Sequence, residues 1–229
     1  MYKPKPRNLS FLTAGFLLLF MSVSVAAQDK EVIVRKGYTL TFINQDQTFD
    51  SALKTRMIET FFKVYPVLAK TYNTKTAKQV TFVIDTAYKG VAATGGDIVS
   101  YSPAWFKKKP GDIDVVTHEV MHIVQAYGES SGPWWVTEGI ADYVRYKFGV
   151  DNAGASWTLP DYKEGQKYDN GYRITARFLV WLEKHSQPKL VQVLDERMRN
   201  HSYTDDLWKE QTGKTLTENW DDYIKNPVL

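Results

Sequence analysis

The sequence predicts an α+β fold, because stretches typical of β-strands come early in the chain and helical patterns fill the rest. The strand-like stretches lie before residue 102, and helix-like periodicity dominates from residue 115 onward. The composition is that of a globular protein, with 229 residues of which 43% are hydrophobic and 24% charged. At this length, and without an internal repeat or a low-complexity linker, we expect a single domain over residues 28–229.

The first 27 residues have the pattern of a secretory signal peptide. Lys3, Lys5 and Arg7 form a positive start, an apolar run follows over residues 11–25, and small residues precede Gln28. We therefore expect residues 1–27 to be removed and the mature protein to be secreted or periplasmic, without stable membrane association. An uncleaved membrane anchor is the alternative, but the apolar run is shorter than the roughly 20 residues that a span requires.

The charge balance and the absence of cysteine exclude several classes of protein. The segment 1–27 holds three Lys or Arg and no acidic residue, so 26 basic and 26 acidic residues remain in the mature chain. A nucleic-acid-binding domain normally keeps a basic surplus on one face, and we expect no nucleic-acid partner here. A chain without cysteine has no disulfides, no thiolate nucleophile and no Cys-ligated zinc.

The first half of the mature chain predicts strands and one helix. Residues 51–70 carry apolar residues at steps of three and four, which predicts a helix with one buried face and Asp50 as its cap. The last two of the predicted strands flank Gly95-Gly96, which favours a tight turn between them. The predicted strands are 38–43, 80–84, 90–94 and 98–101.

The second half predicts helices. Pro110-Gly111-Asp112 interrupts the chain, and Asp112 or Asp114 is placed to cap a helix that runs from Val115 to near Tyr127. The stretch 151–171 is rich in Gly and Asp and predicts a long loop. The other predicted helices are 134–148, 172–185, 188–198, 204–212 and 217–225, the last preceded by a Thr215–Glu218 capping box.

The helix after Asp114 carries the residues that suggest chemistry. His118-Glu119-Val120-Met121-His122 has the H-E-x-x-H spacing, which puts both imidazoles on one helix face, about one turn apart. Neutral imidazole is a good zinc ligand, and a catalytic zinc lowers the pKa of its water to around 7. Glu119 is then placed to take the proton of that water and to deliver it to the leaving amine. The alternative is a pair of surface histidines beside a solvated glutamate.

The next predicted helix offers a third ligand. Glu138 and Asp142 are four residues apart and share a face; Glu138 completes a His/His/Glu zinc set, and Asp142 holds the distal N–H of a ligand histidine. Without the preceding motif, both would be read as solvated carboxylates. The longer H-E-x-x-H-x-x-G-x-x-H pattern is contradicted, because Gln125 and Gly128 occupy its added positions. Several divalent ions suit these ligands, and the motif favours Zn²⁺ as the cofactor.

Three blocks of sequence then carry a likeness to a known family. They are H-E-V-M-H-I-V-Q from His118, E-G-I-A-D-Y-V-R from Glu138 and T-A-R-F-L-V-W-L from Thr175. Together they resemble the plant and bacterial basic secretory protein family, over roughly residues 38–227. The resemblance implies a zinc-dependent peptidase with a zincin-like fold: a small mixed sheet with an edge strand over the metal-binding helix, followed by a mainly helical C-terminal part. The mature chain is neutral, so the word basic does not describe it.

The same resemblance suggests two weaker assignments. Zincins commonly use a tyrosine or histidine to stabilise the oxyanion, and Tyr172 is the first candidate, with Tyr168 second; a core or surface role is the alternative for either. The resemblance also implies an edge strand near residues 98–101 that pairs with an extended substrate, whereas a plain edge strand is the alternative.

These observations predict a secreted zinc-dependent peptide hydrolase, an endopeptidase, whose substrate is a protein or peptide. Two alternatives remain open. One is a zinc hydrolase of modified peptides or glycopeptides, which the same site would serve. The other is a catalytically silent binding protein on a zincin scaffold, against which the presence of Glu119 counts.

Overall fold

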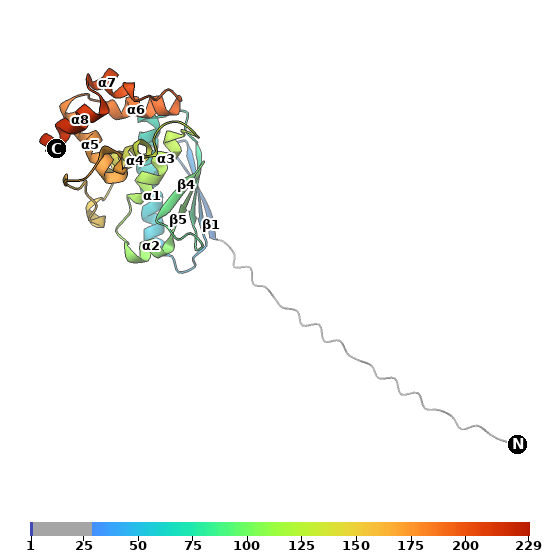
Figure 1. Ribbon diagram of the computed structural model, residues 1–229. Coiled ribbons are helices and arrows are strands. Elements are labelled where there is room, and N and C mark those ends of the chain that lie inside the picture. Colours follow the sequence, from blue (N-terminus) through green and yellow to red (C-terminus); the bar gives the residue numbers. More distant parts are fainter. Residues whose placement is uncertain (2–28) are drawn as a thin grey trace.

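The computed structural model describes Met1 and residues 29–229 (Figure 1). The predicted signal peptide therefore lies, apart from Met1, outside the described residues. In the described part, five strands form one sheet in the order β1-β2-β3-β5-β4, and helices cover one of its faces. The β1–β2 and β4–β5 pairs are antiparallel, and the inner pairs are parallel. The strands are β1 (Asp29–Arg35), β2 (Tyr38–Asn44), β3 (Gln79–Ile84), β4 (Ala92–Gly95) and β5 (Ile98–Tyr101). The predicted α+β class is confirmed.

Strand β1 was not predicted from the sequence. It begins with three charged residues and lies at an edge of the sheet, where Val32 and Val34 are 57% and 68% exposed. It pairs with β2 through a turn at Lys36-Gly37, both of which have positive φ. Hydrogen bonding to β2 therefore makes this segment a strand, and burial of its own side chains contributes little.

The edge strand over the helical layer is β4, so the expectation that residues 98–101 form this edge is wrong. Strand β5 lies between β3 and β4, and its Val99 and Tyr101 are fully buried. The small residues of β4 suit the open edge better. The tight turn at Gly96, where φ is +60°, folds β4 back along β5.

Helix α1 (Ser51–Thr71) provides the connection that makes β2 and β3 parallel. As predicted, the Asp50 side chain caps it by accepting from the Leu53 N–H. Its apolar face packs on the sheet, where the rings of Phe61 and Phe82 meet edge to face at 5.5 Å. Figure 1 shows α1 lying along the strands, behind the rest of the helical layer.

Helix α3 (Val115–Gln125) lies at the centre of the molecule, in contact with α1, β4 and α4 (Trp134–Phe148). Of its residues, all but His122 are buried, so a helix enclosed on several sides positions the H-E-x-x-H motif. Asp114 occupies the N-cap position, but its carboxylate does not cap the helix; it accepts from Thr117 Oγ1 and from the main-chain N–H of Val150 and Asp151. A short helix, α2 (Pro103–Lys108), which the sequence did not predict, precedes α3.

The C-terminal part is helical, as predicted, and packs on α4 through α5 (Tyr172–His185). The loop at 151–171 contains two 3₁₀ turns, η1 (Ala153–Ala155) and η2 (Tyr168–Asn170). The Thr215–Glu218 capping box is present at the start of the last helix. The remaining helices are α6 (Leu190–Arg199), α7 (Asp206–Thr212) and α8 (Leu216–Lys225).

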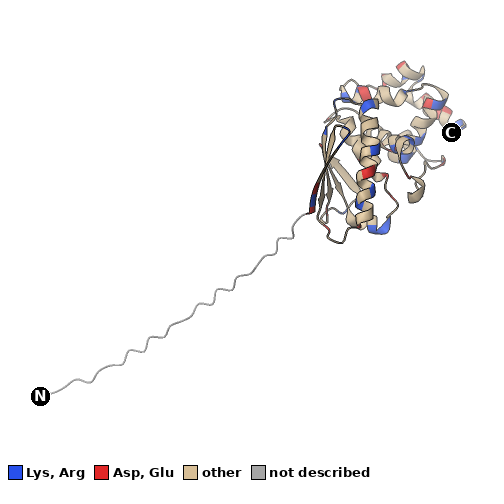
Figure 2. Ribbon diagram, turned by 180° about the vertical axis from the view of Figure 1, so that it is seen from behind, with Lys and Arg blue, Asp and Glu red and all other residues tan. Residues whose placement is uncertain are grey.

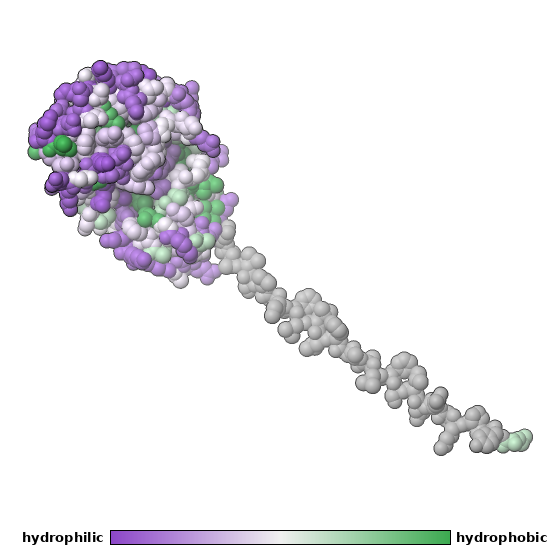
Figure 3. Space-filling model, viewed as in Figure 1, coloured by the Kyte–Doolittle hydropathy of each residue, from purple (hydrophilic) through white to green (hydrophobic). Residues whose placement is uncertain are grey.

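The described surface is mixed in charge. Figure 2 shows Lys and Arg interspersed with Asp and Glu over the helices of that view. On the face in Figure 3 most residues are hydrophilic, and hydrophobic residues gather beside the strands. Among the described residues, no helix combines the length and apolar character needed to cross a membrane.

Candidate metal centre

The two motif histidines converge on one point. They are four residues apart on α3, and their Nε2 atoms lie 3.2 Å from each other. Glu138, in the second turn of α4, brings Oε2 to 3.2 Å from His118 Nε2 and 3.6 Å from His122 Nε2. Helices α3 and α4 thus bring together the three side chains that the sequence singled out, across a separation of 20 residues between His118 and Glu138.

The other ring nitrogens fix how the imidazoles are oriented. His118 Nδ1 lies 2.7 Å from Asp142 Oδ1, and His122 Nδ1 lies 2.7 Å from Gln125 Oε1. The Gln125 amide cannot be reversed without loss, because its NH₂ group donates to the Thr137 carbonyl at 2.9 Å. Both Nδ1 atoms therefore carry a proton, and both Nε2 atoms face the shared point, where a metal ion or a proton can bind them.

The spacing of the three donor atoms fits a divalent ion. Ligands placed tetrahedrally at about 2.0–2.1 Å from zinc lie roughly 3.3–3.4 Å apart. The observed separations of 3.2, 3.2 and 3.6 Å bracket that value. Two imidazole nitrogens and one carboxylate oxygen form a known catalytic zinc set. Three electron-pair donors at these distances repel one another unless a cation lies between them.

The electrostatics of the site favour positive charge. Burial by itself lowers the pKa of His118, but hydrogen bonds and charge from Asp142 and Glu138 outweigh it and raise that pKa to about 10. Burial by itself raises the pKa of Glu138, and the hydrogen bonds with His118 and His122 outweigh it and lower that pKa to about 2. The surrounding carboxylates therefore stabilise a cation at this point, whether a proton or a metal ion carries the charge.

Glu119 lies on the side of α3 that faces the edge strand. Its side chain is buried, and the Thr94 hydroxyl of β4 lies 2.7 Å from Glu119 Oε2 and 3.0 Å from the Glu119 main-chain oxygen. The hydroxyl donates to this carboxylate and thereby connects the edge strand β4 with helix α3. Thr94 was missed at the sequence level, since nothing in its local pattern marks it.

Tyr172 is held beside His118 by an unusual backbone. Its φ is +48°, and it follows Gly171, whose φ is +73° and where a Cβ would come within 2.6 Å of the Trp134 ring. The Tyr172 ring lies nearly parallel to that of His118, with centroids 6.3 Å apart, and its side chain is half exposed. Partial burial and the carboxylates of Glu138 and Asp142 raise its pKa. Tyr168 instead packs against Trp135 and Trp220.

A cleft of about 1010 Å³ runs along α3 and contains these groups. Strand β4 forms one wall, α4 forms another, and residues from the loop after α4 close one end. The cleft is open to solvent. Besides the site residues, its lining includes Tyr88, Trp105, Asp112, Val115, Arg145 and Trp157, and the cationic Lys109 and Arg173.

Gln125 is the second residue that sequence reasoning missed. It is the last residue of the H-E-V-M-H-I-V-Q block and was used only to exclude a longer motif. Its position three residues after His122 was a usable signal, because residues three apart on a helix are neighbours. The contact with Thr137, in contrast, depends on how α4 packs on α3.

The chain is similar to a known protein family over most of its length. The profile of a protein family described as "Peptidase of plants and bacteria" matches residues 23–223. No curated protein sequence matches the chain significantly.

Solved structures of zinc metallopeptidases are similar in fold. An M1 zinc metallopeptidase from Deinococcus radiodurans matches with a TM-score of 0.53 and 14% identity, covering 88% of this chain and 52% of that one. An aminopeptidase N family protein from Idiomarina loihiensis matches with a TM-score of 0.52 and 11% identity, covering 85% of this chain and 46% of that one. The chain thus spans about half the length of these structures, and identities this low show a shared fold alone.

Proposed function

The chain belongs to the BSP family, the peptidases of plants and bacteria, and on this premise we propose that it is an exported zinc-dependent peptide hydrolase that acts as an endopeptidase. The convergence of His118 Nε2, His122 Nε2 and Glu138 Oε2, at separations of 3.2–3.6 Å, carries the proposal. In it, these three side chains hold zinc, and residues 1–27 direct export and are removed.

The chain's own residues then have distinct tasks. Zinc, when bound, polarises the scissile carbonyl and lowers the pKa of water. Glu119 takes the proton of the attacking water and delivers it to the leaving amine nitrogen, while the Thr94 hydroxyl keeps its carboxylate aimed into the cleft. Asp142 and Gln125 keep the two imidazoles in the tautomer that the metal requires.

Tyr172 is the proposed donor to the oxyanion that forms as water adds to the carbonyl. A phenol with an ordinary pKa of about 10 is protonated at neutral pH, and the raised pKa of Tyr172 keeps it so, so that it can donate a hydrogen bond. Because its side chain is half exposed beside His118, it lies where a bound peptide would meet it. The edge of β4 offers main-chain hydrogen bonds to a peptide in extended form.

The test combines elemental analysis of the purified mature protein with peptide cleavage, each measured with and without a chelator. We expect about one zinc per chain and cleavage that the chelator abolishes and zinc restores. Glu119→Gln should retain zinc and lose roughly 10²–10⁴-fold in kcat, because the amide cannot accept the proton. Full activity of this variant, or cleavage that survives metal removal, would contradict the proposal. N-terminal sequencing of the exported protein tests removal of residues 1–27.

A further inference from the structure

The cleft extends past the metal centre toward the N-terminal end of α3, and that end is aromatic. Val115, which lies one turn before His118 on α3, lines this end of the cleft. Two half-buried tryptophans, Trp105 from α2 and Trp157 from the loop after α4, line it as well. On the strand side, the Tyr88 hydroxyl donates to the Ala92 carbonyl of β4 at 2.9 Å and holds a third ring in place.

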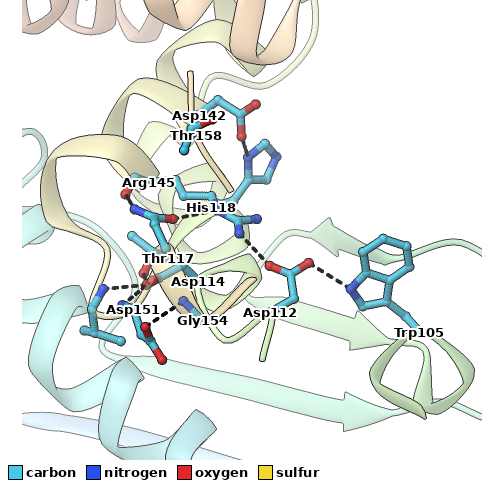
Figure 4. A network of polar contacts seen from close by, with 12 residues as sticks. Trp105, Asp112, Asp114, Thr117, His118, Asp142, Arg145, Asp151, Gly154 and Thr158 are labelled. Carbon is cyan, nitrogen blue, oxygen red and sulfur yellow. Dashed lines mark hydrogen bonds and ion pairs between the residues drawn. The ribbon is translucent and has the colours of Figure 1, made fainter. Parts of the chain in front are cut away.

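The two indoles are joined through a buried ion pair, whose contact with Trp105 is drawn in Figure 4. Trp105 Nε1 donates to Asp112 Oδ2 at 2.9 Å, and the other Asp112 oxygen pairs with Arg145. The Arg145 guanidinium in turn lies over the Trp157 ring, with its carbon 4.5 Å from the ring centroid. Asp112 and Arg145 are only 7% and 5% exposed.

The two rings form an apolar wall, although the cationic Lys109 and Arg173 also line the cleft. The charges of Asp112 and Arg145 compensate each other, and the Trp105 N–H, the polar atom of that ring, is already hydrogen-bonded. A buried ion pair is seldom a net source of stability compared with apolar packing. Here it fixes two large rings whose remaining surfaces line the cleft, which suits a ligand that buries apolar area.

We propose that this end of the cleft is a subsite for a bulky apolar side chain, aromatic or long aliphatic, of the peptide substrate, and that Trp105 and Trp157 determine this specificity. The inference rests on the proposed peptidase function and adds the substrate class.

The experiment uses the zinc-loaded mature protein and blocked peptides of one length. The peptides differ only in one residue next to the scissile bond, on either side, which is Phe, Leu, Ala or Asp. On one of the two sides, kcat/KM for Phe and Leu should exceed that for Ala by about tenfold or more. Trp157→Ala should reduce the ratio of Phe to Ala to less than about threefold, whereas Trp157→Phe should keep most of it.

Two controls keep the outcome interpretable. Tyr146→Ala removes an exposed aromatic residue of α4 that does not line the cleft, and its Phe-to-Ala ratio should equal that of the unmodified protein. Thermal unfolding and zinc content show whether each variant is folded and loaded. If Trp157→Ala fails to fold, Trp105→Ala, which removes the other indole that lines the cleft, provides the second test and should lower the ratio as well.

The possible results separate this inference from the proposed function. Cleavage without a preference, a preference for Asp, or a preference unchanged in the Trp157 and Trp105 variants overturns the subsite while the peptidase stands. If no peptide is cleaved by the zinc-loaded protein, the proposed function fails. Equilibrium binding of the same peptides, followed by tryptophan fluorescence, then decides the subsite: tighter binding of the Phe peptide supports it, and equal binding overturns it.

Discussion

The two imidazoles of the candidate site are supported by chemically different groups. A carboxylate, Asp142, accepts from His118, whereas a neutral amide, Gln125, accepts from His122. A carboxylate raises the basicity of the ring that it holds, and a neutral amide does so less. Gln125 also donates to the carbonyl of Thr137, the residue before Glu138. Its main contribution is therefore geometric, because it ties the second histidine to the helix that carries the third ligand.

Replacement of Gln125 by Leu should weaken zinc binding. The change removes the acceptor for the His122 N–H and the link to Thr137, and the expected loss in zinc affinity is about 10–100-fold. Competition with a chelator of known affinity measures it. The matched control is Gln125→Glu, which keeps an acceptor for His122 but loses the donor to Thr137. Its zinc affinity should lie between those of the unmodified protein and Gln125→Leu. Equal affinities in all three proteins would contradict this role.

At Thr94, a hydroxyl group rather than packing should matter for activity. Thr94→Val has nearly the same shape but cannot donate to the Glu119 carboxylate, so we expect kcat to fall about tenfold with little change in KM. Thr94→Ser retains the donor and should recover most of kcat. Steady-state kinetics on one peptide compares the three proteins. A valine variant with unchanged kcat would show that the carboxylate needs no such support.

At the level of elements, helix α4 connects the candidate site with the C-terminal helices. It carries Glu138, Asp142 and Arg145, which all line the cleft, and its other side packs against α5. At Gly139 the two helices come so close that a Cβ would lie 2.3 Å from the Thr175 Cγ2 methyl. The glycine that follows the third candidate ligand is thus required by helix packing. The position of α5 in turn determines where its first residue, Tyr172, lies.

Replacement of Gly139 by Ala should destabilise the fold. The added methyl must push α5 away from α4, which we expect to cost about 1–3 kcal/mol of the free energy of unfolding. Urea unfolding monitored by tryptophan fluorescence measures it. Thr175→Ser removes the Cγ2 methyl while keeping the hydroxyl that donates to the Tyr168 carbonyl at 2.6 Å, so the double variant should recover part of the loss. A double variant no more stable than Gly139→Ala alone would contradict this explanation.

In the molecule as a whole, a C-terminal helix contacts the ends of both α1 and α3. Arg199 of α6 donates to the Tyr72 carbonyl at the end of α1 and to Asp195. Its other terminal nitrogen lies 3.4 Å from the Gln125 carbonyl at the end of α3. Asp195 is fully buried and also accepts from Tyr127. Burial raises the pKa of Asp195 to about 6, although Arg199 and Tyr127 act in the opposite direction.

This raised pKa predicts a pH dependence of stability. Between the ordinary value of 3.8 and about 6, the folded protein keeps a proton on Asp195 that the unfolded chain releases, so stability falls as pH rises. A shift of about two pH units corresponds to roughly 3 kcal/mol. The free energy of unfolding, measured against that of Asp195→Asn between pH 4 and 7, should decrease by up to this amount. An increase over the same range would mean that the ion pair with Arg199 dominates.

Local patterns in the sequence predicted much of the fold. The helix 51–70, the strands 80–84 and 98–101 and the capping box at Thr215 depend on neighbouring residues, and each appears in the structure with bounds within about two residues. Strand β1 was missed because its pairing with β2 makes it a strand. The short helix α2 was missed because its packing at the end of the cleft, and not its local sequence, determines it. The choice of edge strand was wrong for the same reason: strand order is a property of the assembled sheet.

For the site, the sequence by itself determined that His118 and His122 share one helix face and that Glu138 and Asp142 share another, because both follow from the helical repeat. That residues 28–229 form one domain, and that these side chains hold zinc, stay predictions. Only the tertiary structure decided which groups support them: Gln125 with Thr137, Thr94 with Glu119, and the two tryptophans with Asp112 and Arg145. Most of these contacts join residues far apart in the chain, and no periodicity within one element encodes the distance between two elements.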